Sequence, residues 1–292
     1  MRSYYEATAR ERIAAILDPG SFREILPPPT RTTSPHLAAL ELPVAFDDGI
    51  VIGSGVLDGR PVLVAAQEGG FMGGAVGEVQ GAKLVGLLER ARREKVAGVV
   101  LLIESGGVRL QEANAGLIAV SEVIRAILET RAAGVPVVGA IGGQYGCFGG
   151  MGIAASCCTS LVMSEEGRLG LSGPEVIETA HGVDEFDSRD RALVWRTVGG
   201  KHRYLIGDCQ RLVDDLASAF RAALADAIRG KDRVDSRALE DEQAMLSTRL
   251  ARFGGCEDAL DIWRLLGAPD PEAIPLSPTH ELVAMAAGRR IS

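Results

Sequence analysis

The chain has 292 residues, of which 47% are apolar and 24% are charged, a balance that excludes an intrinsically disordered chain and allows a large buried core. Its formal net charge of -8 argues against nucleic acid as a partner, because nucleic-acid binding requires a basic surface. No apolar stretch approaches the roughly 20 residues of a membrane span, and the charged N-terminus lacks a signal-peptide core, so we expect a cytoplasmic protein without a membrane partner.

The first 48 residues predict a helix and an extended arm. Helical spacing runs from Tyr4 to Leu17 and stops at a Pro-Gly pair, and residues 27–48 are rich in Pro and Thr. From residue 51 onward, two apolar segments joined by Asp58 and Gly59 predict a β-hairpin.

Strands and helices then alternate along the centre of the chain. Three times, a strand or hairpin ends in glycines just before a helix begins. This alternation predicts an α/β fold with a largely parallel sheet and right-handed crossovers. The expected strands are 97–104, 135–142, 160–167 and 168–173, and the expected helices are 78–95, 113–131, 151–157 and one that starts at Pro174.

Beyond residue 182 the sequence becomes more charged and more often interrupted. Apolar spacing predicts amphipathic helices at 211–229 and 236–253, a shorter one at 257–266, and a last helix near the C-terminus. We therefore expect an N-terminal helix and arm, one α/β domain, and a helical extension of that same domain. These regions cover residues 1–48, 49–208 and 209–292.

Two glycine-rich loops follow the buried strands of the central region. The first glycine loop, SGGVRLQE, covers residues 105–112, and the second, GQYGCFGG, covers residues 143–150 before a helix. The carboxyl ends of parallel strands form the edge of a sheet where ligands bind. Backbone N–H groups there can form an oxyanion hole, and glycine leaves room for a substrate. Tight turn geometry alone is the alternative role for these glycines.

Other motifs fit the sequence poorly. A near match to a dinucleotide-binding fingerprint, Gly150 to Ala155, falls inside an expected helix, although Glu165 could mimic the ribose-binding acid. Gly200-Lys201 is followed by His202 rather than Ser or Thr, so it is no Walker loop, and no G-x-S-x-G elbow occurs. Four histidines without H-E-x-x-H and five cysteines without a C-x-x-C pair predict reduced thiols and no metal site.

Four ordered motifs carry a resemblance to a known family. SGGVRLQE resembles the S-G-G-A-R-I-Q-E signature of the carboxyltransferase subunits of acyl-CoA carboxylases, and GCFGG at residues 146–150 resembles their second glycine loop. ARERIAAILDPGSFREI and SGPEVIETAHG keep the same order, so the resemblance extends from Ala9 to Gly182. It implies a crotonase-like fold, a β-β-α spiral, with residues 49–208 as the carboxyltransferase domain.

Within this family, the chain is most similar to the β subunits of biotin-independent malonate decarboxylases, through SYYEATARERI and VWRTVGGKHRYLIGDCQ. The resemblance implies decarboxylation of a malonyl thioester to an acetyl thioester through an enolate. The acyl group would ride on the CoA-derived, phosphopantetheine-type arm of an acyl carrier protein, with no cofactor bound directly and no biotin. Many relatives contain two crotonase-like units, whereas this chain has length for one, so a homologous γ subunit is the expected partner.

The motif match also implies site residues. The enolate hole is assigned to the N–H groups around Gly149 and Gly150, helped by the loop at Gly106 and Gly107. Phe148 and Met151 are expected to form an apolar wall for the substrate, with core packing as the alternative. Arg109 either contacts the substrate or holds its own loop through carboxylate hydrogen bonds.

Two further groups of residues have more than one interpretation. Arg196, Lys201 and Arg203 are expected to bind CoA-type phosphates or an acidic carrier protein; the alternative is a solvated face paired with nearby acids. The proton that completes the reaction could come from water, from the partner or from one of several side chains. The nearby acids are Asp184, Glu185, Asp187 and Asp190, and the candidate proton donors are Tyr145, Cys147, Glu112 and His181.

Two other functions remain open from sequence. A biotin-dependent carboxyltransferase subunit would use the same loops, because both reactions pass through a thioester enolate. A non-catalytic scaffold that pairs with a catalytic homologue would keep the glycines for folding alone. A hydratase or isomerase is disfavoured, because MGIAASCC after GCFGG contains no acidic residue.

Overall fold

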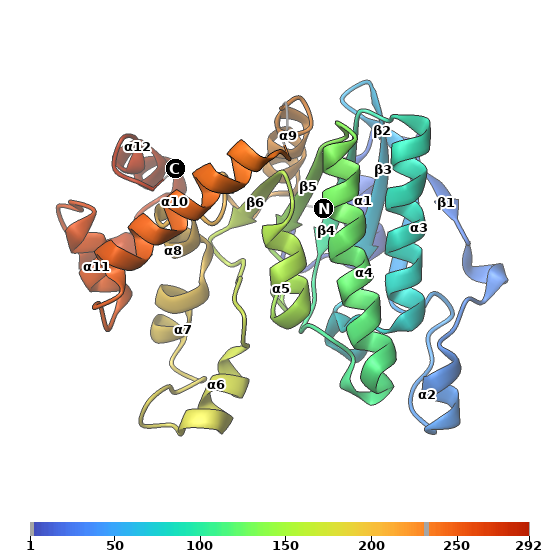
Figure 1. The fold of residues 1–292 in the computed structure, drawn as a ribbon, viewed down its shortest axis with the longest axis horizontal. Coiled ribbons are helices and arrows are strands. Elements are labelled where there is room, and N and C mark those ends of the chain that lie inside the picture. The colour runs from blue at the N-terminus through green and yellow to red at the C-terminus, as the bar shows by residue number, and fades with distance from the viewer. Residues whose placement is uncertain (1–2, 231–233, 292) are drawn as a thin grey trace.

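The computed structural model describes residues 3–230 and 234–291, and a seven-stranded sheet forms its centre (Figure 1). The strands lie side by side in chain order. Strand β2 pairs antiparallel with both β1 and β3, and every pairing from β3 to β7 is parallel, as the alternating pattern predicted. The strands are β1 (Arg23–Ile25), β2 (Ile50–Leu57), β3 (Arg60–Gln67), β4 (Gly98–Ile103), β5 (Val137–Ile141), β6 (Ser160–Ser164) and β7 (Arg211–Val213).

The predicted hairpin is confirmed between β2 and β3. Leu57 pairs with Arg60, which leaves Asp58 and Gly59 as a two-residue loop. Both loop residues have positive φ, 50° and 74°, as a type I′ turn requires, and glycine at the second position adopts it without steric cost.

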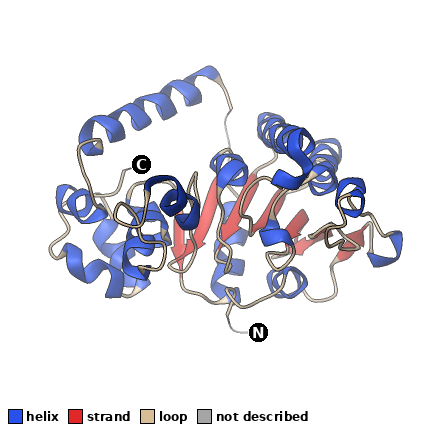
Figure 2. Cartoon of the chain, turned by 90° about the horizontal axis from the view of Figure 1, so that it is seen from below, coloured by secondary structure: helices blue, strands red, loops and turns tan. Residues whose placement is uncertain are grey.

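Helices cover both faces of the sheet, which lies between them in edge view (Figure 2). Along β4, the side chains of Val99, Leu101 and Ile103 pack in the hydrophobic cluster under α3, α4 and α5. Val100 and Leu102 point to the opposite face and pack with α1 and α9. Because successive strand residues face opposite sides, a continuously apolar strand is what two covered faces require.

Most of the expected helices are confirmed, with four differences. The helix expected from Tyr4 begins at Ala9, and the arm expected to be extended contains α2 (Pro35–Ala39). Helices α7 and α8 were not predicted, and at residues 211–229 Arg211–Val213 forms edge strand β7 before α9 begins. The longest C-terminal helix, α10, has Phe253 as its buried residue. The α-helices are α1 (Ala9–Ile16), α2 (Pro35–Ala39), α3 (Glu78–Glu94), α4 (Ala113–Ala132), α5 (Gly149–Ser156), α6 (Pro174–His181), α7 (Arg191–Val198), α8 (Gly200–Leu205), α9 (Ala217–Ala227), α10 (Ser236–Phe253), α11 (Ala259–Leu265) and α12 (Thr279–Ala286), and the 3-10 helices are η1 (Pro28–Thr30), η2 (Met72–Gly74), η3 (Leu110–Glu112) and η4 (Pro271–Leu276).

A second, shorter ladder connects the loops that follow the strands. Parallel bridges join Val76 to Val108, Ser105 to Cys147, and Cys147 to Leu169. Each unit of the centre is therefore a strand, a short bridged segment and a helix, the repeating β-β-α arrangement that was expected. The expected strand at 168–173 is reduced to these bridges and does not join the main sheet.

The sheet crosses both boundaries expected from the sequence. β1 lies before residue 49 and β7 lies after residue 208, so both flanking regions contribute strands to the central sheet. In the part of the chain that the structure describes, no helix combines the length and apolar character needed to cross a membrane.

Candidate active site

The two glycine loops meet at the carboxyl ends of β4 and β5. Ser105 N–H donates to the carbonyl of Gly146 at 2.8 Å, and Phe148 N–H donates to the carbonyl of Ser105 at 2.9 Å. Parallel pairing of Ile103 with Ile141 brings the two strand ends together. The first glycine loop is thus fixed against the second by backbone hydrogen bonds, at the sheet edge where ligands bind in α/β folds.

Gly107 and Gly149 mark the closest approach of the loops. A Cβ atom on Gly149 would lie 3.2 Å from Gly107 Cα, and one on Gly107 would lie 3.2 Å from the carbonyl oxygen of Phe148. Both residues also have positive φ, 118° and 56°. Glycine is required at each position because a side chain would be strained and would push the loops apart.

Most of the amides expected to line an oxyanion hole already donate within the chain. Gly149 N–H donates to Leu171 O at 3.0 Å and Gly106 N–H to Gly73 O at 2.8 Å. Gly107 N–H donates to its neighbour Ser105 Oγ at 3.1 Å. Of the four glycine amides expected as donors, the one left for a substrate is that of Gly150.

The free donors lie one residue further into helix α5 than expected. Among residues 3–230 and 234–291, the N–H groups of Gly150 and Met151 have no hydrogen-bond partner. They occupy the second and third positions of α5, where no preceding turn supplies a carbonyl and the positive end of the helix dipole is concentrated. Two adjacent amides of this kind form an anion-binding site.

The side chains of Phe148 and Met151 are buried in hydrophobic clusters. Phe148 is 5% exposed and packs with Val194 and Val198, and the Arg168 guanidinium lies 5.8 Å from its ring. Met151 is 1% exposed and belongs to the main core. Both side chains therefore do the core packing that was the alternative to a substrate wall.

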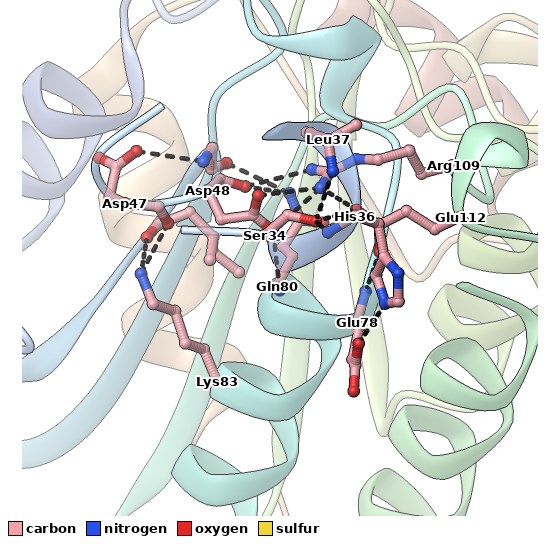
Figure 3. A network of polar contacts seen from close by, with 12 residues as sticks. Ser34, His36, Leu37, Asp47, Asp48, Glu78, Gln80, Lys83, Arg109 and Glu112 are labelled. Atoms are coloured by element: carbon pink, nitrogen blue, oxygen red, sulfur yellow. Dashed lines mark hydrogen bonds and ion pairs between the residues drawn. The ribbon is translucent and has the colours of Figure 1, made fainter. Parts of the chain in front are cut away.

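Arg109 holds the far end of the first glycine loop. Its side chain is fully buried, and Nη1 donates to both carboxylate oxygens of Asp48, at 2.9 and 3.0 Å, and to Glu112 at 2.8 Å (Figure 3). The polar network around it draws side chains from the N-terminal arm and from α3 into one buried cluster. Arg109 thus has the loop-holding role that was one of its two expected functions.

Glu112 lies at the centre of the same network. It accepts hydrogen bonds from the Ser34 hydroxyl at 2.7 Å, from Glu78 N–H at 2.7 Å and from Arg109 (Figure 3). Burial alone would raise the pKa of this carboxyl, but these hydrogen bonds outweigh burial and lower the pKa below its usual value. A carboxylate that is ionised and fully engaged at neutral pH is a poor proton donor, which argues against the role considered for Glu112.

The other proton-donor candidates lie in different environments. Cys147 is fully buried between the loops, and burial raises the pKa of its thiol. His181 is exposed at the end of α6. Tyr145 belongs to the second glycine loop, and its side chain is 41% exposed. Of the four candidates, Tyr145 combines a place in a glycine loop with an accessible side chain.

The three basic residues expected to bind phosphates or a carrier protein are already paired, though not with the expected acids at 184–190. Arg196 pairs with Asp258 at 3.0 Å and Arg203 with Asp208 at 2.8 Å. Lys201 donates to the carbonyl of Pro275 at 2.7 Å and pairs with a glutamate after β6. Asp258 and Pro275 belong to the C-terminal extension, so Arg196 and Lys201 hold that extension against α7 and α8, whereas the pair of Arg203 with Asp208 is local.

A cavity of about 350 Å³ opens beside these residues, at the carboxyl end of β6. Two indole rings and a mixture of acidic and basic side chains form its wall. The lining residues are Glu165, Glu166, Arg191, Ala192, Trp195, Arg196, Lys201, Trp263 and Pro275. Within the described residues, no group of three or more His, Cys, Asp or Glu side chains is arranged to hold a metal ion.

Sequence reasoning missed the buried acids next to the first glycine loop. Asp48, which pairs with Arg109, was assigned to the end of an extended arm. Glu104 is 3% exposed and follows directly on apolar strand β4. A charged residue that ends an otherwise apolar strand was the available signal, because such a side chain is buried only when it is paired.

Comparisons with known proteins agree with this architecture. A family model of the carboxyl transferase domain matches residues 4–199. The malonyl-S-ACP:biotin-protein carboxyltransferase MADC of Malonomonas rubra is 41% identical over 306 residues, which cover 98% of this chain and 96% of that protein.

Two solved structures are similar in both sequence and fold. One chain of a Pseudomonas malonate decarboxylase hetero-tetramer in complex with malonate is 42% identical, with a TM-score of 0.83 over 91% of this chain and 97% of the other. One chain of a Pseudomonas malonate decarboxylase MdcD-MdcE hetero-dimer is 39% identical, with a TM-score of 0.67 over 84% and 97%. These likenesses confirm the crotonase-like fold and the resemblance to malonate decarboxylase subunits. The chain therefore belongs to the carboxyl transferase family.

Proposed function

We propose that this chain, together with a homologous partner subunit, decarboxylates a malonyl thioester carried on an acyl carrier protein. The bond between the methylene carbon and the carboxylate breaks, CO2 leaves, and the electron pair forms an enolate with its negative charge on the thioester oxygen. A proton then adds to the methylene carbon and gives the acetyl thioester. The enzyme must therefore bind the enolate more tightly than the neutral thioester.

The observation that carries the proposal is the pair of unpartnered amides at Gly150 and Met151. A thioester oxygen in front of α5 would accept both hydrogen bonds, and those bonds strengthen as the oxygen becomes negative. In the neighbouring first glycine loop, Gly106 carries no side chain, and a Cβ there would have only Gly73 O within 4 Å, at 3.4 Å, which leaves clearance for the thioester. Tyr145, in the second glycine loop and 41% exposed, is one candidate to deliver the proton, beside water and a group of the partner subunit.

An exposed apolar surface beside the loops supports a partner subunit there. Leu117 and Ile118 on α4 are 55% and 61% exposed, and Ile153 on α5 is 48% exposed. The two helices pack together where Gly150 lies against Val120, so these side chains share one face. We call these three residues the loop-side apolar surface; Leu110, Leu171 and Val176 are further exposed apolar residues, in or after the loops that follow β4 and β6.

The relatives of known structure are also assemblies of different subunits. The Pseudomonas malonate decarboxylases are a hetero-tetramer and a hetero-dimer. We propose that the homologous subunit covers the loop-side apolar surface, completes the site and excludes water from it. Removal of water strengthens the hydrogen bonds to the enolate.

The cavity at the end of β6 is the proposed place for the CoA-derived arm. Its indole rings at Trp195 and Trp263 offer an apolar wall, and Arg196 and Lys201 line its opening. Both cations already have carboxylate partners that neutralise their charge. We therefore propose that they donate hydrogen bonds to the arm rather than attract an acidic carrier protein by their charge.

Transfer of the carboxyl group to biotin is the second candidate, because the Malonomonas rubra relative is a malonyl-S-ACP:biotin-protein carboxyltransferase. That reaction passes through the same enolate and would use the same amides. The two functions differ in the fate of the carboxyl group, which is released as CO2 in one and bound to biotin in the other. A scaffold role would need neither free amide.

Substitution of Gly150 tests the proposal at its central contact. Gly150→Pro removes the amide hydrogen from the first turn of a helix, where proline is tolerated because no helical bond is lost. Gly150→Ala adds a Cβ at the same place, 2.7 Å from Val120 Cγ1, and keeps the N–H, so it controls for the added bulk.

The measurement is CO2 release from a malonyl thioester by the assembled complex. Loss of one oxyanion-hole donor costs about 10²- to 10³-fold in kcat, so the proline variant should be slower than the alanine variant by this factor. Equal rates for the two variants, with both folded and assembled, would contradict the proposed hole. Equal and undiminished rates would favour the scaffold role.

A further inference from the structure

Glu104 lies directly between strand β4 and the first glycine loop, and among the described buried acids its carboxylate is the one that bonds to the second glycine loop. Its Oε1 accepts a hydrogen bond from Tyr145 N–H at 3.0 Å, and its Oε2 accepts one from Arg12 Nη1. The bond to Tyr145 is followed by the backbone bonds of Ser105 to Gly146 and Phe148. The hydrogen bond between Glu104 and Tyr145 is therefore the first in a series of contacts between the two loops, and the last is the close approach of Gly107 and Gly149.

The carboxylate has no room to move. A Cβ on Gly143 would lie 2.5 Å from Glu104 Oε1, and a Cβ on Gly69 would lie 2.7 Å from its Cδ. The backbone of Glu104 is fixed as well, because its N–H donates to Gln67 Oε1 at 3.2 Å. Glycines on both sides thus let the backbone enclose the acid.

Arg12 holds the other oxygen from helix α1, on the opposite face of the sheet from α5. Arg12 is 1% exposed; its Nε donates to the carbonyl of Tyr4 at 3.1 Å and its Nη2 to that of Tyr5 at 3.3 Å. The guanidinium lies 4.8 Å from the Tyr4 ring centroid. These contacts orient the guanidinium, so the carboxylate of Glu104 has a fixed direction.

The same buried network continues to the far end of the first loop. Gln67 Nε2 donates to Gln80 Oε1 at 3.0 Å, and Gln80 N–H donates to Asp48 at 3.1 Å. Asp48 in turn pairs with Arg109. Residues 105–108 are therefore held at both ends by one chain of buried hydrogen bonds, and Glu104 alone extends that chain to the second loop.

We propose that Glu104 is a positioning residue for the decarboxylation: oriented by Arg12, it sets the separation of the two glycine loops and hence the place of the Gly150 and Met151 amides. This inference rests on the proposed function, since the amides matter only if a substrate oxygen binds them. A displacement of about 1 Å at such a site costs on the order of 10²-fold in rate. Glu104 itself touches no substrate.

Two charge-neutral double variants separate positioning from simple stability. Arg12→Met/Glu104→Gln removes the ion pair and keeps an oxygen for Tyr145 N–H, whereas Arg12→Met/Glu104→Leu removes the oxygen as well. Replacing both charges avoids the large penalty of a single unpaired buried charge. The two variants are expected to have similar melting temperatures and to assemble equally well.

The expected result is a kcat for the leucine variant about tenfold or more below that of the glutamine variant, with KM within about twofold. Hydrogen exchange of the second glycine loop should be faster in the leucine variant alone. Equal kcat and equal exchange in the two variants would overturn the proposal. If no protein releases CO2, including the wild type, the proposed function fails. The exchange measurement still tests whether Glu104 holds the second glycine loop in place.

Arg12→Lys covers the case in which neither double variant folds. Lysine keeps the charge but cannot make the three directed contacts of the guanidinium, so Glu104 loses its fixed orientation. A lower kcat at unchanged KM is expected in the assembled complex. An unchanged kcat together with unchanged exchange of the second glycine loop would overturn the proposal here too.

Discussion

Gly107 and Gly149 face each other across the junction of the two glycine loops, so close that a Cβ on Gly149 would lie 3.2 Å from Gly107 Cα. This contact brings the first glycine loop against the start of α5, where the free amides of Gly150 and Met151 lie. The spacing of the two loops is thus part of the site, and glycine at both positions permits the close approach.

Gly149→Ala is expected to damage activity more than stability. An L-residue at φ 56° costs about 1–2 kcal/mol, and the new methyl group also pushes the loops apart, which should lower kcat on the order of 10²-fold. Gly134→Ala is the matched control: it has φ 82° and open space around its Cβ, so it should cost similar stability without loss of activity. Equal activity of the two variants, by CO2 release, would contradict the close approach.

Arg109→Met should destabilise the fold strongly. It leaves the buried carboxylates of Asp48 and Glu112 without their shared cation, a change that typically costs about 3–5 kcal/mol. Arg125→Met also removes an arginine with two glutamate partners, but that cluster is exposed to solvent, so its loss should cost far less stability. Chemical denaturation of both variants checks the contrast, and a loss below about 1 kcal/mol for Arg109→Met would refute it.

His202 should make the folded chain less stable in mild acid. Burial lowers the pKa of His202 from its ordinary value of about 6.5 to about 3, so the unfolded state takes up a proton as pH falls below about 6.5 and the folded state does not. The contribution is complete above that pH and is lost at up to about 1.4 kcal/mol per pH unit toward pH 3. His202→Gln should flatten the pH dependence of the unfolding free energy. Identical slopes for variant and wild type would show that His202 titrates normally.

The loop-side apolar surface should be needed for assembly. Ile118→Glu places a charge where we propose the partner subunit packs, so it should prevent co-purification of that subunit and leave the melting temperature of the isolated chain nearly unchanged. Leu216→Glu is the control, because Leu216 is 43% exposed beside α9 on the other side of the sheet. Retention of the partner by the Ile118 variant would place the interface elsewhere.

Much of the fold could be predicted from the sequence because its signals are local. The hairpin follows from Asp58-Gly59, and the strand-helix alternation follows from apolar runs ending in glycine. The three-residue strand β7 could not be predicted, because the apolar spacing around Arg211 also fits a helix. Only pairing with Val162 on β6 makes it a strand.

The site was predictable as two loops but not as individual donors. The Gly149 N–H donates to the carbonyl of Leu171. Among the described residues, the N–H groups of Gly150 and Met151, in the first turn of α5, have no partner. A hydrogen bond between residues so far apart in the chain has no local sequence signal. The charge at the end of an apolar strand signals that Glu104 is buried and paired, but its partner Arg12 is distant in the chain and has no local signal.

The most direct test of the account is CO2 release from a malonyl thioester on its carrier protein, by this chain purified with its homologous partner, with and without avidin. Biotin-independent decarboxylation by the assembled site predicts release that avidin leaves unchanged and that the isolated chain does not support. Release abolished by avidin, or carboxyl transfer that appears only when a biotin protein is added, would contradict biotin-independent decarboxylation. Either result would indicate that the site transfers the carboxyl group to biotin.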